Sequence, residues 1–223
     1  MKFLCHVVPR TGAEEDCTAW IASLGHRLKV ATAEEAISIL CLTRLPGDVF
    51  GKDTPFHATL EVEGRGATPE RLAELLSALS KELLEVGHPE RSTALMGEDH
   101  AFRAPQPAAS VRHQYLMRRK PTTTHAAYLE HYRGIHAQFG LETPGIAGYV
   151  QFHVDPDASQ RVARAAGLGV FDIDSVSQLY LESQEHFLAA VSDSPIGPRA
   201  IADEEQFVDR AHSMHFCSRP VEA

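Results

Sequence analysis

The 223-residue chain has little positive charge and no long apolar run. Lysine and arginine total 21 against 30 aspartates and glutamates, so the formal net charge is −9. A surface that binds nucleic acid or an anionic membrane needs a basic patch. The only dense basic run, Arg118–Lys120, lies at the end of an expected strand. We therefore expect neither nucleic acid nor a membrane as a partner.

Cysteine is also scarce, and its spacing excludes two kinds of site. The apolar run at the N-terminus is too short for a secretory signal, and none of the later runs could cross a bilayer. Closely paired cysteines would indicate a disulfide framework or a zinc site. The four present, Cys5, Cys17, Cys41 and Cys217, have no short paired spacing. We expect reduced, buried thiols in a soluble cytoplasmic protein.

What remains is ordinary globular composition, 43% hydrophobic and 23% charged, which is enough to build a full core. The length fits one large domain or two halves of about 110 residues. The segment Ala-Pro-Gln-Pro-Ala-Ala-Ser at residues 104–110 has linker character. We therefore divide the chain into an N-terminal half (1–104), a linker (105–110) and a C-terminal half (111–223).

Local patterns predict the same order of elements in both halves. In the first, strands are expected at 2–8, 36–42, 56–62 and within 92–103, although residues 33–36 also fit a helical turn. Helices are expected from Ala13 to a cap at Gly25, and between an N-cap at Thr68 and a stop at Gly87. In the second, strands are expected at 111–119, 147–154, 175–181 and 212–217. Helices are expected from about 124 to 139, at 183–191 and at 200–208, with 155–172 as a loop or a helical turn.

This order predicts an α+β protein built from two ferredoxin-like βαββαβ repeats. Each repeat would cover one face of an antiparallel sheet with helices, so the other face must be buried elsewhere. Packing the two open faces together produces a single pseudo-dimeric α/β barrel. The repeat is one of topology, since the halves share no residue-level identity.

Residues 128–139 carry the densest chemistry. On a helix, Tyr128, Tyr132, His136 and Phe139 fall on one arc, and polar tips on a buried stripe need hydrogen-bond partners. His136 is thus either a core histidine satisfied by a backbone carbonyl or a functional one. His131 is five residues away, which on an α-helix separates the two rings by about 140°. We expect it at the flank of the helix, unlike the i,i+4 histidines of a helical zinc site.

The strands supply further candidates through their two-residue period. His113 and Tyr115 share one face of their strand, and Tyr149 and Gln151 share one face of the next. The pattern does not say which face meets the helices, and each residue also fits a core or interface position. We predict that His113 and Tyr115 face His136.

Several motifs of the C-terminal half occur in one characteristic order. They are Tyr128-x-x-x-Tyr132-x-x-x-His136-Ala137, Pro144-Gly145-x-x-x-Tyr149, Asp174 followed by Leu179–Ser183, and Ala202-Asp203-Glu204-x-x-Phe207-Val208-Asp209. With them, residues 111–218 resemble the EthD-type branch of the dimeric α/β barrel superfamily. The first half lacks the helix motif and resembles a diverged barrel partner.

The resemblance implies a fold more than a reaction. Relatives include polyketide cyclases, decarboxylases, lactone isomerases, small monooxygenases and haem enzymes. In the cyclase-like members, a histidine and a tyrosine between sheet and helices perform acid–base work. His136 occupies the family's histidine position, and Tyr132 fits the aromatic residue one turn earlier.

We predict a cofactor-independent acid–base enzyme, a lyase or isomerase of the polyketide-cyclase kind, acting on a mostly apolar, oxygenated small molecule. A neutral imidazole at His136 would accept a proton and a tyrosine would donate one. The alternatives are a non-catalytic small-molecule-binding barrel and a cofactor-free monooxygenase; a homodimer also remains open. The predicted catalytic residues are His136, Tyr132 and Tyr115, and the predicted substrate-binding residues are Tyr128, His113, Phe139, Tyr149 and Gln151.

Metal and haem are the competing explanations for thirteen histidines. Five of them lie on expected strands and could converge: His6, His57, His113, His153 and His215. No aspartate or glutamate accompanies them at a recognisable spacing. Haem would need a proximal histidine, for which His136 is a candidate, and partners for its propionates. We predict no metal and no cofactor. Asp203, Phe207 and Asp209 are interpreted as a cap and staple of the last short helix.

Overall fold

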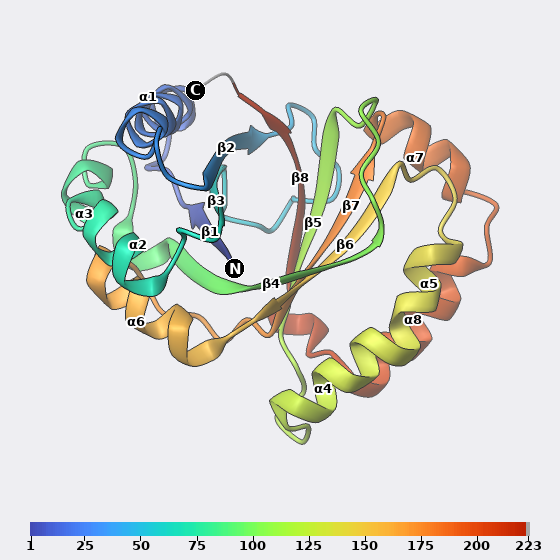
Figure 1. Ribbon diagram of the computed structural model, residues 1–223. Coiled ribbons are helices and arrows are strands. Elements are labelled where there is room, and N and C mark those ends of the chain that lie inside the picture. Colours follow the sequence, from blue (N-terminus) through green and yellow to red (C-terminus); the bar gives the residue numbers. More distant parts are fainter. Residues whose placement is uncertain (222–223) are drawn as a thin grey trace.

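The computed structural model describes residues 1–221, in which eight strands close into an antiparallel barrel. Around the barrel the order is β1-β3-β2-β8-β5-β7-β6-β4 (Figure 1). The pairs β2–β8 and β4–β6 join the two halves. The strands are β1 (Lys2–Val7), β2 (Ile37–Arg44), β3 (Ala58–Gly64), β4 (Thr93–Arg103), β5 (Val111–Met117), β6 (Gly148–Val154), β7 (Ser175–Leu181) and β8 (Met214–Pro220).

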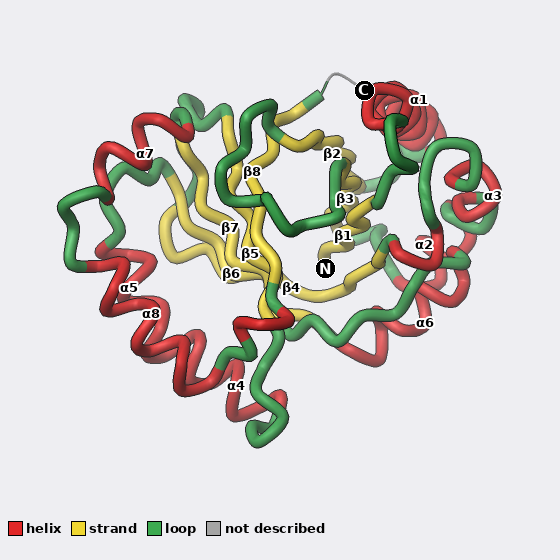
Figure 2. The backbone as a smooth tube through the Cα atoms, turned by 180° about the vertical axis from the view of Figure 1, so that it is seen from behind, coloured by secondary structure: helices red, strands yellow, loops and turns green. Residues whose placement is uncertain are grey.

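The helices surround the barrel on two sides (Figure 2). Around the N-terminal strands lie α1 (Glu14–Ala31), α2 (Pro69–Leu75), α3 (Leu79–Leu83) and α6 (Pro156–Ala166). Around the C-terminal strands lie α4 (His125–His131), α5 (Ala137–Glu142), α7 (Gln184–Val191) and α8 (Ile196–Phe207). Short segments are η1 (Pro89–Arg91), the π-helical η2 (Tyr132–His136) and η3 (Arg210–His212). Within residues 1–221, none of the helices is both long and apolar enough to span a membrane.

Three expectations about helices were wrong. Gly25 does not end α1, which continues to Ala31 because its buried face extends to Leu28. The expected helix at 68–87 is broken into α2 and α3. The last helix, α8, begins at Ile196, so Pro198 lies in its first turn, where a missing N–H costs nothing.

The segment 155–172 contains a full helix, α6, and its position shapes the rest of the molecule. Asp155 caps it by accepting a hydrogen bond from the Ala158 N–H at 2.9 Å, and Gly167 ends it at φ 68°. Although α6 follows β6, its apolar face packs with α2 and β4 over the N-terminal half. Among the described residues, the outer face of the C-terminal sheet is therefore covered by α4, η2, α5, α7 and α8.

The equivalent outer face of the N-terminal half is filled by apolar side chains. Cys5, Cys41 and Leu60 of the sheet pack against Cys17 and Ile21 of α1 in one continuous core. The cysteines are buried and free, as expected, and burial raises the pKa of Cys5 to about 12. These thiols are packing residues in the described structure.

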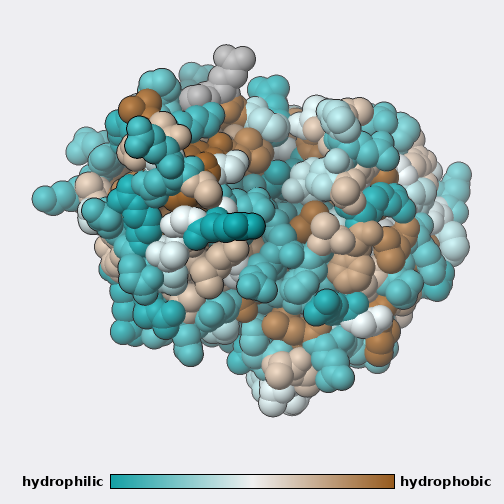
Figure 3. All heavy atoms as spheres, in the orientation of Figure 1, coloured by the Kyte–Doolittle hydropathy of each residue, from teal (hydrophilic) through white to brown (hydrophobic). Residues whose placement is uncertain are grey.

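The barrel interior changes from apolar to charged along its axis. Leu4, Phe152 and Phe216 contribute to the apolar end. At the other end, Lys2 pairs with Asp99 at 2.9 Å, and Arg112 pairs with Glu61. This end opens between the two lobes of the molecule, where hydrophilic side chains gather (Figure 3). The Arg112–Glu61 pair links β5 of one half to β3 of the other, whereas Lys2 and Asp99 both belong to the N-terminal half. Buried charges of this kind are tolerated only when they are paired.

Candidate active site

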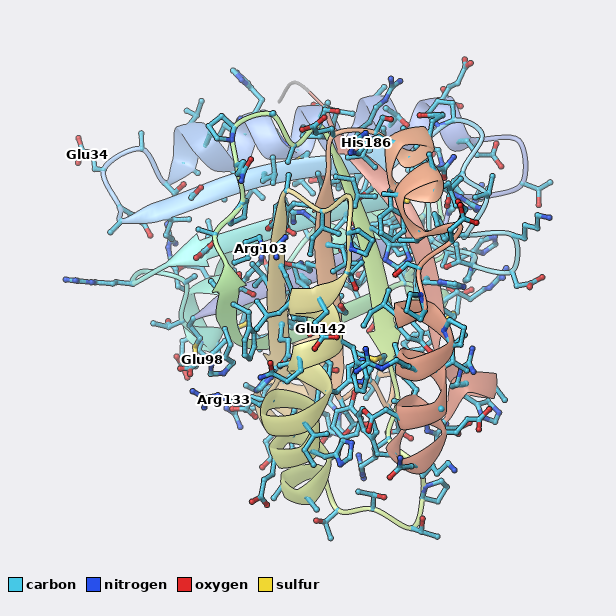
Figure 4. All side chains as sticks on the ribbon, turned by 90° about the vertical axis from the view of Figure 1, so that its right-hand side faces the viewer. Glu34, Glu98, Arg103, Arg133, Glu142 and His186 are labelled. Atoms are coloured by element: carbon cyan, nitrogen blue, oxygen red, sulfur yellow. The ribbon has the colours of Figure 1, made fainter. Side chains whose placement is uncertain are left out.

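A cleft lies between the outer face of the C-terminal sheet and the helices that cross it. Figure 4 shows the helix formed by α4, η2 and α5 beside α8, in front of the strands, with Glu142 at the end of α5. Arg199 of α8 donates to Glu142 at 3.0 Å and lies 5.5 Å from the ring centroid of Phe139. These contacts tie the two helices together at one end of the cleft.

The π-helical turn η2 determines which side chains meet in this cleft. In a π-helix, hydrogen bonds run from residue i to i+5, and such turns occur often at functional sites. Here the turn brings His131 and His136 onto one carboxylate, that of Asp203 on α8. Nδ1 of His136 lies 2.8 Å from Oδ2, and Nε2 of His131 lies 3.0 Å from Oδ1. The expected α-helical separation of the two rings was wrong, and Asp203 is no helix cap.

The Asp203 contact defines the protonation pattern of His136. A carboxylate only accepts hydrogen bonds, so Nδ1 of His136 carries the proton and the Nε2 lone pair is free. His136 is 8% exposed. Burial lowers its pKa, and the opposing effect of Asp203 only partly offsets this. The neutral imidazole, a proton acceptor at Nε2, is therefore the dominant form at neutral pH.

Glu204, the residue after Asp203, stands on the other side of the free nitrogen. Its Oε1 lies 3.9 Å from Nε2 of His136, and its Oε2 lies 3.3 Å from Nε of Arg210. Burial raises the pKa of Glu204 to about 7, although Arg210 and a hydrogen bond with Tyr115 lower it. Burial also raises the pKa of Tyr115 to about 12. The cleft thus combines one base with two groups that hold protons near neutral pH.

The hollow beside His136 has a volume of about 130 Å³ and continues into a larger one of about 580 Å³. The two share His113, Tyr115, Ala200 and Glu204 in their walls. Phe139 and Tyr149 also line the inner part. The outer part is lined by Phe187, Arg210 and His215, and by Phe50 from the N-terminal half. Both halves of the chain therefore build the cleft.

The predicted site residues divide into cleft-lining and buried groups. His113, Tyr115, Phe139 and Tyr149 line the cleft with His136, so β5 presents the face that we expected toward this helix. Tyr132 lies entirely inside, with its ring stacked on His136 at a centroid distance of 5.7 Å. Among the described residues its hydroxyl has no hydrogen-bond partner.

Tyr128 and Gln151 are likewise buried behind the cleft. The Tyr128 hydroxyl shares a 2.7 Å hydrogen bond with Ser175, and Gln151 donates to the Tyr149 hydroxyl at 2.7 Å. Gln151 also donates to the backbone carbonyl of Tyr132 at 3.0 Å. These side chains hold the wall in place rather than forming its surface.

Asp203, Glu204, Arg210 and Phe50 were not among the predicted site residues. The only sequence signal for two of them was the adjacent pair Asp203-Glu204 within the last motif. A residue inside a helix and 67 positions from His136 cannot be paired with it from local pattern. Phe50 carried no signal because it lies on a loop of the other half.

The strand histidines do not converge. His6 contacts Thr59 at 3.0 Å inside the barrel, and His57 contacts Thr18 at 2.9 Å beside α1. His153 bonds to Gln151 at 2.9 Å, whereas His113 lies 3.4 Å from His215. Within the part of the chain that the structure describes, no group of three or more His, Cys, Asp or Glu side chains is arranged to hold a metal.

A closed barrel with helices outside and a cleft between helices and sheet defines the class: a dimeric α/β barrel within one chain. A crystal structure of an anthrone oxidase-like protein superposes with a TM-score of 0.64 at 13% identity, covering 99% of this chain and 90% of that one. A dye-decolorizing peroxidase from Bacteroides thetaiotaomicron VPI-5482 gives 0.56 at 8% identity, covering 98% and 92%. A monooxygenase-like protein from Lactobacillus acidophilus NCFM gives 0.53 at 11%, covering 99% and 92%. At these identities the likeness shows the fold alone.

A family model matches part of the chain, within the C-terminal half. Residues 120–211 match the model of the EthD domain, which confirms the resemblance inferred from the motifs of this half. The match contains η2, Asp203 and Glu204, and therefore the center of the cleft. No protein of curated function matches the chain.

A haem group, the alternative raised by the sequence, would meet unfavourable surroundings beside His136. The inner hollow of about 130 Å³ is smaller than a tetrapyrrole, so a haem at His136 would have to extend into the outer hollow. Oε1 of Glu204 lies 3.9 Å from Nε2 of His136, the nitrogen that would have to bind the iron. The single arginine of the cleft wall, Arg210, is already paired with Glu204 and is not free for a propionate.

Proposed function

We propose that this cleft is the active site of a cofactor-independent acid–base enzyme for an oxygenated, mostly apolar small molecule. The observation that carries the proposal is the pairing of His136 with Asp203, which leaves Nε2 unprotonated beside Glu204 and Tyr115. Aromatic walls on a pocket with a few polar groups suit a ring-containing ligand. A lyase or isomerase is the reaction class that these groups support without any redox partner.

The proposed step moves one proton from carbon and one to oxygen. Nε2 of His136 takes a proton from a carbon acidified by a carbonyl group, and the bonding electrons shift to the carbonyl oxygen. Glu204 in its protonated form, or the Tyr115 hydroxyl, donates to that oxygen and yields the enol. Asp203 holds the imidazole in the required tautomer and stabilises the imidazolium that forms.

Tyr115 is better placed than Tyr132 to act as the proton donor. Tyr115 lines the cleft and contacts Glu204, whereas Tyr132 is fully buried against the far face of His136. A donor must reach the substrate oxygen within hydrogen-bond distance. Tyr132 then acts as the wall that keeps the imidazole ring from tilting.

Two further inferences belong with this proposal. The strand orders β4-β1-β3-β2 and β8-β5-β7-β6 are identical in the two halves, which supports their origin as ferredoxin-like repeats.

A carbanion formed at the cleft is also the species that reacts with dioxygen in a cofactor-free monooxygenase. Relatives of the monooxygenase-like and anthrone oxidase-like kinds share the fold, so oxygen uptake is measured beside proton exchange.

The test uses anthrone, a flat tricyclic ketone whose methylene is acidified by the carbonyl across the ring. Exchange of the methylene protons for deuterium in D₂O, followed by NMR under nitrogen, reports proton abstraction whatever the later fate of the carbanion. We expect the protein to accelerate exchange, and His136→Ala to abolish the acceleration without loss of fold. His212→Gln is the matched control, because His212 pairs with Asp209 at 2.8 Å on the surface.

Two results would contradict the proposal. One is anthrone binding without accelerated exchange, which indicates a non-catalytic binding barrel. The other is equal exchange in the wild type and in His136→Ala. A burst of oxygen uptake that depends on His136 would instead show that the protein is a cofactor-free monooxygenase that begins with the same proton abstraction.

A further inference from the structure

A second imidazole touches the center of the proposed site but takes no part in the proposed reaction. Nε2 of His131 lies 3.0 Å from Oδ1 and 3.2 Å from Oδ2 of Asp203. His131 does not line the cleft, and its side chain is 22% exposed. Its ring packs on Phe207 at a centroid distance of 4.4 Å. His131 is therefore held in place against the carboxylate that orients His136.

The backbone is built to make this contact. His131 ends α4, and the π-helical turn Tyr132–His136 follows it directly. Without the extra residue of a π-turn, a helix would place only one of the two imidazoles on Asp203. An irregular turn that costs regular α-helical hydrogen bonds persists only when the surrounding contacts maintain it. Here the Asp203 carboxylate, shared by the two imidazoles, and the ring of Phe207 supply those contacts. The ring centroids of Phe207 and His136 are 5.4 Å apart.

We propose that His131 is a positioning residue of this site that competes with His136 for the Asp203 carboxylate and so sets the proton affinity of the base. The catalytic consequence of this inference rests on the proposed function. The electrostatic interaction between His131 and His136 does not depend on it. One carboxylate stabilises one imidazolium well, and a positive charge on either ring opposes a positive charge on the other. A positive charge on His131 therefore weakens the hold of Asp203 on an imidazolium at His136.

Burial is the largest influence on the pKa of His136, and several charged or titratable groups besides His131 also face it. From α8, Asp203 and Glu204 face His136, and Arg210 of η3 faces Glu204 from behind. On the same helix, Tyr132 stacks between His136 and Tyr128. From the sheet, the titratable groups that line the same cleft are His113, Tyr115 and Tyr149. The charge of His131 lowers the pKa of His136, against the raising effect of Asp203.

The experiment is an NMR titration of the His136 imidazole in the full-length protein, with ¹³C-labelled histidine and no ligand. In His131→Gln, the side-chain amide can still donate to Asp203 but cannot carry a positive charge. We expect the pKa of His136 to rise, because a positive charge that opposes its protonation is removed. His212→Gln, which removes the surface histidine that pairs with Asp209, should leave it unchanged.

An unchanged pKa of His136 in a folded His131→Gln protein would overturn the inference. Should that variant fail to fold, Asp203→Asn supplies the second measurement: the pKa of His136 must fall, and the ¹³C chemical shifts of both His131 and His136 must change. A shift of His136 alone would show that the two rings do not share the carboxylate.

The anthrone exchange assay separates this inference from the proposed function. If the wild type accelerates exchange, the acidic limb of its pH profile should move upward in His131→Gln by the same amount as the NMR pKa. If the wild type has no exchange activity but the NMR shift is present, the proposed function fails and the coupling stands. A purely structural role of His131 would change stability without moving the profile.

Discussion

Phe50 of the N-terminal half packs edge-on against His113 of the C-terminal half, with ring centroids 4.9 Å apart. The loop that carries Phe50 is anchored across the halves by Gln184, which accepts from the Val49 N–H at 3.1 Å and donates to the Gly47 carbonyl at 3.2 Å. The N-terminal half has a filled outer face of its own. The N-terminal half contributes to the site through Phe50, which forms part of the wall of the cleft in the C-terminal half.

Removing that wall should weaken binding of flat aromatic ligands. In Phe50→Ala, we expect the Kd of 1,8-dihydroxyanthraquinone, an oxidised probe without the acidic methylene, to rise about tenfold, the equivalent of roughly 1.4 kcal/mol of ring contact. Fluorescence titration measures it, and Leu84→Ala, an exposed apolar site outside the cleft, is the control. Equal affinity in both variants would mean that the ligand does not reach the outer part.

Replacing the orienting carboxylate should reduce turnover far more than binding. In Asp203→Asn, the side chain has no negative charge and only one oxygen that can accept hydrogen bonds from the two imidazoles. His136 therefore loses the interaction that keeps its proton on Nδ1. We expect anthrone exchange to fall by about 10²-fold or more, the usual contribution of a positioned base, with little change in the Kd of the anthraquinone. Asp209→Asn, which alters a surface His–Asp pair of the same 2.8 Å length, should retain full exchange. Parallel losses in the two variants would contradict the role of Asp203.

The pH dependence of exchange should be bell-shaped. The rate rises as His136 loses its proton, at a pKa that burial holds below its ordinary value of 6.5. It falls again as Glu204 loses its proton, at a pKa of about 7. In Glu204→Gln the decrease in rate near pH 7 should be absent, because Gln does not titrate and burial raises the pKa of Tyr115 to about 12. An alkaline limb that survives in this variant would assign it to another group.

The charged end of the barrel should make stability sensitive to acid. Burial acts to raise the pKa of Glu61, but Arg112 and Lys2 outweigh it and hold the pKa below the ordinary 4.5. A carboxyl with a depressed pKa stabilises the fold above its unfolded value and loses that contribution as the pH falls through the folded value. Glu61→Ala should therefore lower the free energy of unfolding at pH 7 by about 3–5 kcal/mol, the cost of leaving a buried partner charge unpaired.

Urea denaturation at pH 7 and pH 3.5 checks this prediction. The difference between wild type and Glu61→Ala should narrow at the lower pH. Glu35→Ala, which removes an ion pair of 2.5 Å with Arg71 near the surface, is the control and should cost far less stability, because solvent screens an exposed pair. A pH-independent difference would indicate that lost packing, not charge, dominates the effect.

The sequence by itself determined the parts that local periodicity encodes. Alternation along β5 separated His113 and Tyr115 from Arg112 and Gln114, and the structure places the first pair toward the helices and the second inside the barrel. The helical stripe likewise identified His136 as a buried imidazole near that strand. Such patterns repeat every two residues or every turn, so a few neighbours suffice to read them.

Only the tertiary structure decided what those residues do to one another. The π-turn that aligns His131 with His136, the Asp203 carboxylate between them, the proton held by Glu204 and the wall formed by Phe50 all depend on packing between distant segments. A pKa is set by burial and by charges that arrive from other elements. No window of local sequence contains that information, because the partners meet only when the barrel closes.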